Sequence, residues 1–145
     1  MEKYELLPQQ LLYEGTCTEE NFFEPQRPND KYILAVHDPD YYYDLINITL
    51  DQRAARKIGF PLSEGLVERE VIIADGSLKA SEFAFQHGIA MNIAGGTHHA
   101  YTNRGEAFCL LNDQAIAARY LQKNGLASNI SVSYTHLTLP TICSV

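Results

Sequence analysis

The sequence lacks most features that would place a protein in a special class. It has no apolar run long enough to span a membrane, and its N-terminus lacks the apolar stretch of a secretion signal. We therefore expect a cytoplasmic protein with no membrane partner. The three cysteines are an odd number without ligand-like spacing, which argues against a disulfide framework and against a cysteine metal site.

Positive charge is also scarce, and no charged residue follows Lys123. Eleven lysines and arginines stand against 18 aspartates and glutamates, which gives a net charge of −7. An acidic chain is not drawn to the phosphates of nucleic acid, so we expect no direct nucleic-acid partner.

The remaining pattern is that of an α/β domain. The 145 residues, 46% of them hydrophobic, have the length and composition of one globular domain. Two short apolar runs, 31–36 and 89–93, predict buried strands. Caps and periodic apolar positions predict helices at 4–13, 39–46, 49–57, 63–87 and 114–123, the fourth with an interruption at Asp75-Gly76. Strands separated by such helices indicate a parallel sheet with crossover helices.

The pair His98-His99 follows the second predicted strand, directly after Gly95, Gly96 and one further residue. Functional groups collect in loops just past the carboxyl ends of parallel strands. Glycines let the backbone turn closely around a cavity, so that both imidazoles can border it. Two imidazoles beside a metal-bound water can divide the work, one taking the proton and the other stabilising charge. Two ordinary loop histidines, one of them a metal ligand, are the alternative.

Another histidine, His37, follows the first predicted strand and precedes Asp38. The two side chains have the order of a general base and its orienting carboxylate. The sequence favours a simpler interpretation, a turn in which Asp38 caps a helix that begins at Pro39. Cys109 has no base or cation near it in the sequence, so we expect a buried, unreactive thiol.

Four segments keep the order and spacing of a known family. They are Val36-His-Asp-Pro-Asp-Tyr41, Arg56-Lys-Ile-Gly-Phe-Pro61, Asn92-Ile-Ala-Gly-Gly-Thr-His-His-Ala100, and Arg104-Gly-Glu-Ala-Phe-Cys109 with Asn112-Asp113. Together they resemble the zinc-dependent histone deacetylase superfamily, and within it the bacterial branch that is similar to class IV histone deacetylases. The resemblance covers nearly all of residues 1–130, and the Gly-Gly-X-His-His element with a following Phe-Cys is its specific part.

The resemblance implies the arginase/deacetylase fold, a three-layer αβα arrangement with a parallel sheet, of which this chain holds the N-terminal part. The implied activity is hydrolysis of an N-acetyl or longer N-acyl amide on lysine or a related amine. By the same match, His99 is the general base and later the general acid, and His98 stabilises charge in the tetrahedral transition state. Phe108 lines the channel for the acyl-lysine stem, and Gly95 and Gly96 let the backbone turn beneath the site.

The family residues that bind the metal have no counterpart in this sequence. In the family, an Asp-x-Asp-x-His element and a distant Asp bind Zn2+, and a later Tyr polarises the substrate carbonyl. We therefore expect the Zn2+ ligands in a missing C-terminal part, no metal ligand in this chain, and no activity from this chain alone. A metal-free module that binds acyl-lysine without hydrolysing it is the alternative function.

Residues 131–145 do not fit the family pattern. The run Val132-Ser-Tyr-Thr-His-Leu-Thr-Leu-Pro-Thr141 matches a translation of the transposon-end adapter used in short-read sequencing libraries. We predict that residues 1–130 are the native N-terminal part of a histone deacetylase-like domain. The tail, 131–145, is predicted to be non-native, translated adapter.

Overall fold

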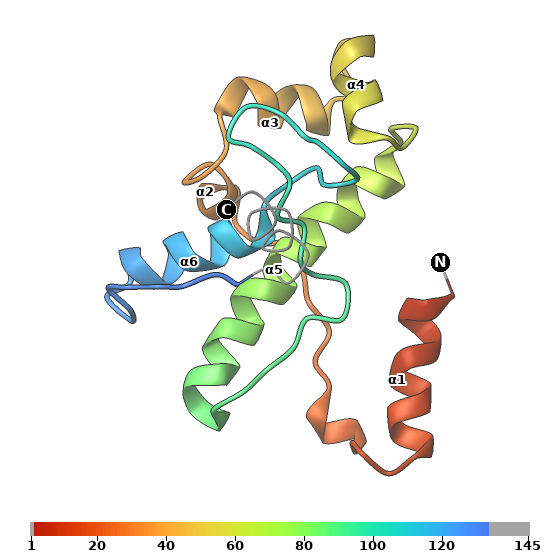
Figure 1. The fold of residues 1–145 in the computed structure, drawn as a ribbon, viewed down its shortest axis with the longest axis vertical. Coiled ribbons are helices and arrows are strands. Elements are labelled where there is room, and N and C mark those ends of the chain that lie inside the picture. The colour runs from red at the N-terminus through yellow and green to blue at the C-terminus, as the bar shows by residue number, and fades with distance from the viewer. Residues whose placement is uncertain (1, 134–145) are drawn as a thin grey trace, which may run out of the picture.

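Helices dominate the computed structural model, which describes residues 2–133 (Figure 1). Most of the predicted adapter segment falls on residues 134–145, so that prediction lies outside the described residues. The elements are α1 (Lys3–Tyr13), the 3-10 turn η1 (Glu19–Asn21), α2 (Asp30–Ile33), α3 (Pro39–Ile46), α4 (Gln52–Ile58), α5 (Glu64–His87) and α6 (Asp113–Lys123). The long helix α5 is the central element; α3 and α6 pack against it, and α2 packs against α6.

The predicted helix starts and stops are confirmed where they depend on local chemistry. Asp38, Ser63 and Asn112 each accept a hydrogen bond from a backbone N–H in the first turn of α3, α5 and α6. Gly59 and Gly88 follow α4 and α5 with φ of 85° and 88°, a backbone conformation that suits glycine.

The two predicted strands, 31–36 and 89–93, are wrong. Helix α2 occupies the start of the first segment, because the Asn29 side chain accepts the Lys31 N–H and begins a helical turn. This local cap outweighs β propensity where no neighbouring strand offers a ladder of hydrogen bonds. Residues 2–133 contain no strand, only two isolated antiparallel bridges, Tyr101 with Arg104 and Glu106 with Cys109.

The segment 89–93, which was predicted as the second strand, runs back along α5 without a strand partner (Figure 1). Asn92 attaches it to the helix, because its Nδ2 donates to the Ile73 carbonyl and to the Ser77 hydroxyl, each at 2.9 Å. The segment is therefore attached to α5 through one of its own side chains rather than through a sheet.

The predicted interruption of α5 at Asp75-Gly76 is also wrong, since the helix runs unbroken through both residues. Asp75 is buried, and its carboxylate accepts the Gln26 N–H at 2.8 Å. A Cβ at Gly76 would lie 2.8 Å from Asn92 Nδ2. These two residues serve close packing against α5, which a sequence pattern does not distinguish from a helix break.

The hydrophobic core lies where α3, α5 and α6 meet, and Leu110 and Leu111 fix the α6 end of the loop between α5 and α6 in it. Each fully buried large side chain contributes about 1.5 to 3 kcal/mol relative to its exposed state. The largest buried apolar side chains are Tyr42, Ile33, Leu45, Ile58, Leu110, Leu111, Ile116 and Val71. Helix α1 contributes no buried residue and contacts α5 through Arg69, which lies 4.8 Å from the centre of the Tyr4 ring.

No helix within residues 2–133 is both long and apolar enough to cross a membrane.

Candidate active site

The predicted histidine pair, His98 and His99, lies on the loop between α5 and α6, and residues 94–104 are called the histidine loop from here on. The two half-buried imidazoles have ring centroids 4.3 Å apart and planes inclined by 42°. His98 Nδ1 lies 2.8 Å from the Gly96 carbonyl oxygen. Because a carbonyl can only accept, Nδ1 carries the proton and donates it to Gly96.

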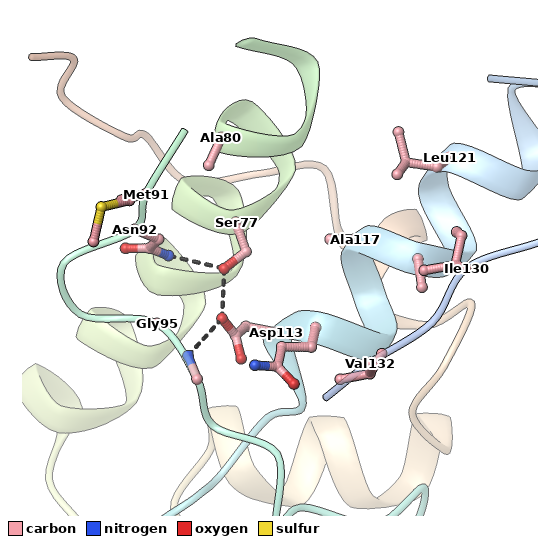
Figure 2. A pocket seen from close by; sticks show the side chains of 13 residues that line it. Ser77, Ala80, Met91, Asn92, Gly95, Asp113, Ala117, Leu121, Ile130 and Val132 are labelled. Atoms are coloured by element: carbon pink, nitrogen blue, oxygen red, sulfur yellow. Dashed lines mark hydrogen bonds between the residues drawn. The ribbon is translucent and has the colours of Figure 1, made fainter. Parts of the chain in front are cut away.

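Asp113, the first residue of α6, anchors the histidine loop. Its side chain is buried, and Oδ1 accepts the Thr97 N–H at 2.8 Å and the Thr97 hydroxyl at 2.9 Å. Oδ2 accepts the Gly96 N–H at 3.0 Å and the Ser77 hydroxyl at 2.5 Å. Asn92 extends this chain of hydrogen bonds by donating to Ser77 (Figure 2). Charge-assisted bonds from four donors offset the cost of burying the carboxylate.

Gly95 and Gly96 allow the loop to turn this closely around Asp113. A Cβ at Gly95 would lie 2.8 Å from Asp113 Oδ2 and 3.0 Å from Asn92 Nδ2. Gly96 has a φ of 94°, which residues with a side chain rarely adopt. The close backbone turn that the double glycine predicts is thus present, while the catalytic role of the loop stays a prediction.

Gly95→Ala is expected to lower the free energy of unfolding by about 1 to 3 kcal/mol, because the added methyl group displaces Asp113 from the loop amides. Gly65→Ala is the matched control: a Cβ there meets no atom within 4 Å, and alanine favours the helix. Urea denaturation of both variants checks the prediction. Wild-type stability in Gly95→Ala would contradict it.

Asn112 holds the next part of the histidine loop. Its Nδ2 donates to the carbonyls of His98 and Ala100 at 3.2 and 3.1 Å. Its backbone N–H donates to Nε2 of His37 at 3.0 Å, and His37 Nδ1 lies 3.3 Å from the Thr102 carbonyl. His37 is 2% exposed, and Asp38 caps α3, so the simpler of the two interpretations of this dipeptide is confirmed. No sequence pattern indicates that His37 reaches the histidine loop.

His37 makes stability depend on pH. Burial lowers its pKa below the usual value of 6.5, and the hydrogen bond from Nδ1 to Thr102 offsets this only in part. The unfolded chain therefore binds a proton more readily than the folded chain. The contribution of His37 to stability is expected to be constant above about pH 6.5 and to fall as the pH drops toward the lowered pKa. Burial raises the pKa of Glu70 to about 7, so this carboxyl contributes with the opposite sign. Unfolding free energies measured between about pH 8 and pH 5 check the prediction, because wild type should lose more stability than His37→Gln as the pH falls. An unchanged slope in that variant would show that another group is responsible.

Phe108 lies on a tight turn with an unusual backbone. Ala107 and Phe108 have φ of 48° and 68°, a region that costs about 1 to 3 kcal/mol for such residues. Their N–H groups donate to carbonyls at the C-terminal end of α4, which holds the turn in place. The Phe108 ring is 58% exposed and packs against Phe60 with centroids 4.9 Å apart. The turn therefore presents an aromatic face at the surface.

Cys109 links this turn to the histidine loop. Its thiol is buried and faces the backbone N–H groups of His99 and Ala100. Burial raises the pKa of the Cys109 thiol, which agrees with the prediction of a buried, unreactive cysteine. Phe108 is thus the direct sequence neighbour of a residue whose thiol faces the backbone of His99 and Ala100.

A pocket of about 470 Å³ lies between α5 and α6, lined mainly by small and apolar side chains (Figure 2). Gly95 and Gly96 contribute to its wall, but neither histidine of the pair nor Phe108 does. This pocket therefore lies at the Gly95-Gly96 turn and not at the histidine pair or Phe108.

The part of the chain that the structure describes does not fit a metal ion on its own. Within residues 2–133 no three His, Cys, Asp or Glu side chains gather in a way that could hold one. The histidine pair offers two imidazoles, and both oxygens of the buried Asp113 already accept hydrogen bonds. A tetrahedral zinc site needs three or four protein ligands.

The loop geometry and the order of its motifs define the class of protein. Residues 1–132 match the histone deacetylase domain, and the chain belongs to that family.

Two curated relatives show how much of the family domain is present. An uncharacterized protein of Picosynechococcus sp. is 42% identical over 132 residues, which cover 91% of this chain and 44% of that protein. The acetoin utilization protein AcuC of Bacillus subtilis is 29% identical over 97 residues, 59% of this chain and 25% of that protein. The chain spans less than half the length of these relatives.

Solved structures agree on the fold. An HDAC homolog from Aquifex aeolicus has a TM-score of 0.63 at 24% identity, and the match covers 75% of this chain and 32% of that one. An HDAC homolog complexed with SAHA has the same TM-score at 26% identity, with the same coverage. The predicted arginase/deacetylase fold, a three-layer αβα arrangement, is confirmed as the fold class, and residues 2–133 contribute helices to it.

Proposed function

We propose that this chain is the N-terminal part of a zinc-dependent deacylase that hydrolyses an acetyl or longer acyl amide on lysine or a related amine. The observation that carries the proposal is the histidine pair, with rings 4.3 Å apart on a loop tied to the start of α6. Membership of the histone deacetylase domain family supports it, as does the structural likeness to an HDAC homolog complexed with SAHA.

The two imidazoles have different roles in this proposal. His99 takes a proton as general base and returns it as general acid, and His98 stabilises developing charge. The bond from His98 Nδ1 to Gly96 supports this, because a proton added at Nε2 gives an imidazolium whose other N–H is already held by a carbonyl.

Phe108 forms one wall of the path for the acyl-lysine stem in this proposal. An exposed aromatic face suits contact with a methylene chain, and the Phe60 ring behind it adds to the apolar surface. The partner implied by this wall is acyl-lysine or another acetylated amine.

Zinc supplies a bound water of lowered pKa when present in such sites. Since residues 2–133 do not provide a ligand set, we propose that the Zn2+ ligands lie in the part of the family domain that this sequence does not contain.

The test is to restore the gene downstream of residue 130 and to measure acetate release from acetyl-lysine peptides, with and without a zinc chelator. We expect chelator-sensitive hydrolysis by the complete protein and none by the 145-residue chain. Peptide binding without hydrolysis by the complete protein would support the metal-free module instead. Hydrolysis by the 145-residue chain would contradict the proposed division of the site.

We also propose that residues from about 131 onward are translated adapter and that 1–130 are native. The family match, which ends at residue 132, supports a junction in this region. Resequencing the genomic locus across the junction tests it, and a genomic read that encodes Tyr134-Thr-His-Leu137 would rule it out.

A further inference from the structure

His37 lies outside the residues to which the family resemblance gives a role, yet it contacts the histidine loop. It sits between α2 and α3 and is almost fully buried, at 2% exposure. The Tyr41 ring lies beside it, with centroids 6.0 Å apart. A buried imidazole in such a place needs partners for both ring nitrogens.

Both nitrogens of His37 are used, and their bonds define one tautomer. The Asn112 N–H donates to Nε2 at 3.0 Å, so this nitrogen carries no proton. The proton is on Nδ1, which faces the Thr102 carbonyl at 3.3 Å. The neutral ring therefore bridges the start of α6 and the far end of the histidine loop.

Together with the bonds of Asn112, this bridge means that hydrogen bonds hold every second carbonyl of the loop from residue 98 to residue 102. Asn112 Nδ2 binds the carbonyls of residues 98 and 100, and the carbonyl of residue 102 accepts both His37 Nδ1–H and the Asp38 N–H. Three alternate carbonyls on both sides of His99 are thus fixed. His37 also binds the backbone of the same asparagine that holds the other two.

We infer that His37 is a positioning residue for the reaction: its neutral imidazole ties Asn112 to Thr102 and so fixes the backbone that carries the histidine pair. The inference rests on the proposed function, because it assigns the histidine pair to the chemical step. A catalytic group misplaced by about 1 Å can cost about 100-fold in rate. Loss of the bridge should therefore lower kcat, while binding of the substrate stem against Phe108 is retained.

Three variants of the complete protein separate the two bonds. His37→Phe keeps the ring size and loses both bonds. His37→Gln keeps an acceptor for the Asn112 N–H, and His37→Asn keeps a donor for the Thr102 carbonyl. Val71→Ala is the control for stability alone, because Val71 is fully buried in the core on α5 and has no hydrogen bond to the loop.

With acetyl-lysine peptides we expect His37→Phe to lower kcat about 100-fold and to change KM by less than about threefold. His37→Gln should recover about tenfold of that loss, and Val71→Ala should lower the Tm with kcat within about twofold of wild type. Wild-type kcat in a folded His37→Phe protein would overturn the inference, as would an equal loss of kcat in Val71→Ala. If His37→Phe does not fold, wild-type kcat in both His37→Gln and His37→Asn would overturn it.

A second measurement does not depend on turnover. Nitrogen-15 spectra of the imidazoles should show His98 and His99 signals that move in His37→Phe and return toward wild type in His37→Gln. If the complete protein proves inactive, the proposed function fails while these spectra still decide the inference. Unmoved signals in His37→Phe would overturn it.

Discussion

Alanine at His99 in the complete protein is expected to lower kcat/KM for an acetyl-lysine peptide by about 100- to 10,000-fold. This is the usual contribution of a positioned general acid and base, and the loss should appear in kcat. The variant also removes one ring of a pair whose centroids lie 4.3 Å apart, without cutting the bonds that hold the loop to Asp113 and Asn112. The protein should therefore keep its fold and its affinity for an acyl-lysine analogue that cannot be hydrolysed.

His87→Ala is the matched control for this experiment. His87 is exposed in the last turn of α5, so the same chemical change is made away from the histidine loop. Its kcat/KM should stay within about twofold of wild type, as for most surface substitutions. Initial rates over a range of peptide concentrations give kcat and KM for both variants. A folded His99→Ala protein with kcat within threefold of wild type would exclude His99 as the base.

His98→Ala should behave differently from His99→Ala. If His98 only stabilises charge, its loss should cost about 100- to 1,000-fold in kcat, the usual effect of losing one such donor. Because His99 is still present in His98→Ala, the rate of this variant should still fall at low pH, where the base is protonated. Identical pH profiles for the two alanine variants would show that the two imidazoles do not have separate roles.

The fold was predictable from the sequence where a few neighbouring residues decide the structure. The caps at Asp38, Ser63 and Asn112 work within one turn of helix, so their residue types are enough. Strands depend on partners that are distant in sequence, and the β-branched run at 31–36 had none among the described residues. The Asn29-Asp30 pair in front of this run is a helix-cap signal that could have corrected the prediction.

The candidate site was predictable only in its contiguous part. Gly95, Gly96 and the histidine pair lie within five consecutive residues, so the motif itself predicts the close turn that the structure has. The residues that hold the loop come from elsewhere in the chain: Asp113 is 16 positions from Thr97, and Asn112 is 75 positions from His37. Asn112-Asp113 also fits a helix cap, and this local role hid the second role of the same two residues.

Asp113→Ala is expected to be the most destabilising substitution in the histidine loop network. It removes the acceptor for two backbone N–H groups and two hydroxyls, all in a region where the carboxylate is 1% exposed. An unsatisfied buried donor costs about 1 to 3 kcal/mol, and water can reach part of the half-buried loop. We therefore expect a loss of about 3 to 5 kcal/mol in the free energy of unfolding, similar to removal of one partner of a buried ion pair.

Asp113→Asn and Asp38→Ala separate the anchor from a simple helix cap. In Asp113→Asn the side chain keeps an oxygen that accepts from Thr97, and its amide can donate to the Ser77 hydroxyl. The Gly96 N–H then faces a donor instead of an acceptor. We therefore expect Asp113→Asn to lose about half of the unfolding free energy that Asp113→Ala loses. Asp38→Ala removes only a cap and should cost about 1 kcal/mol. Urea denaturation of the complete protein measures all three. A loss in Asp113→Ala no larger than that in Asp38→Ala would mean that the carboxylate caps α6 and does not hold the loop, so the histidine pair would need another support.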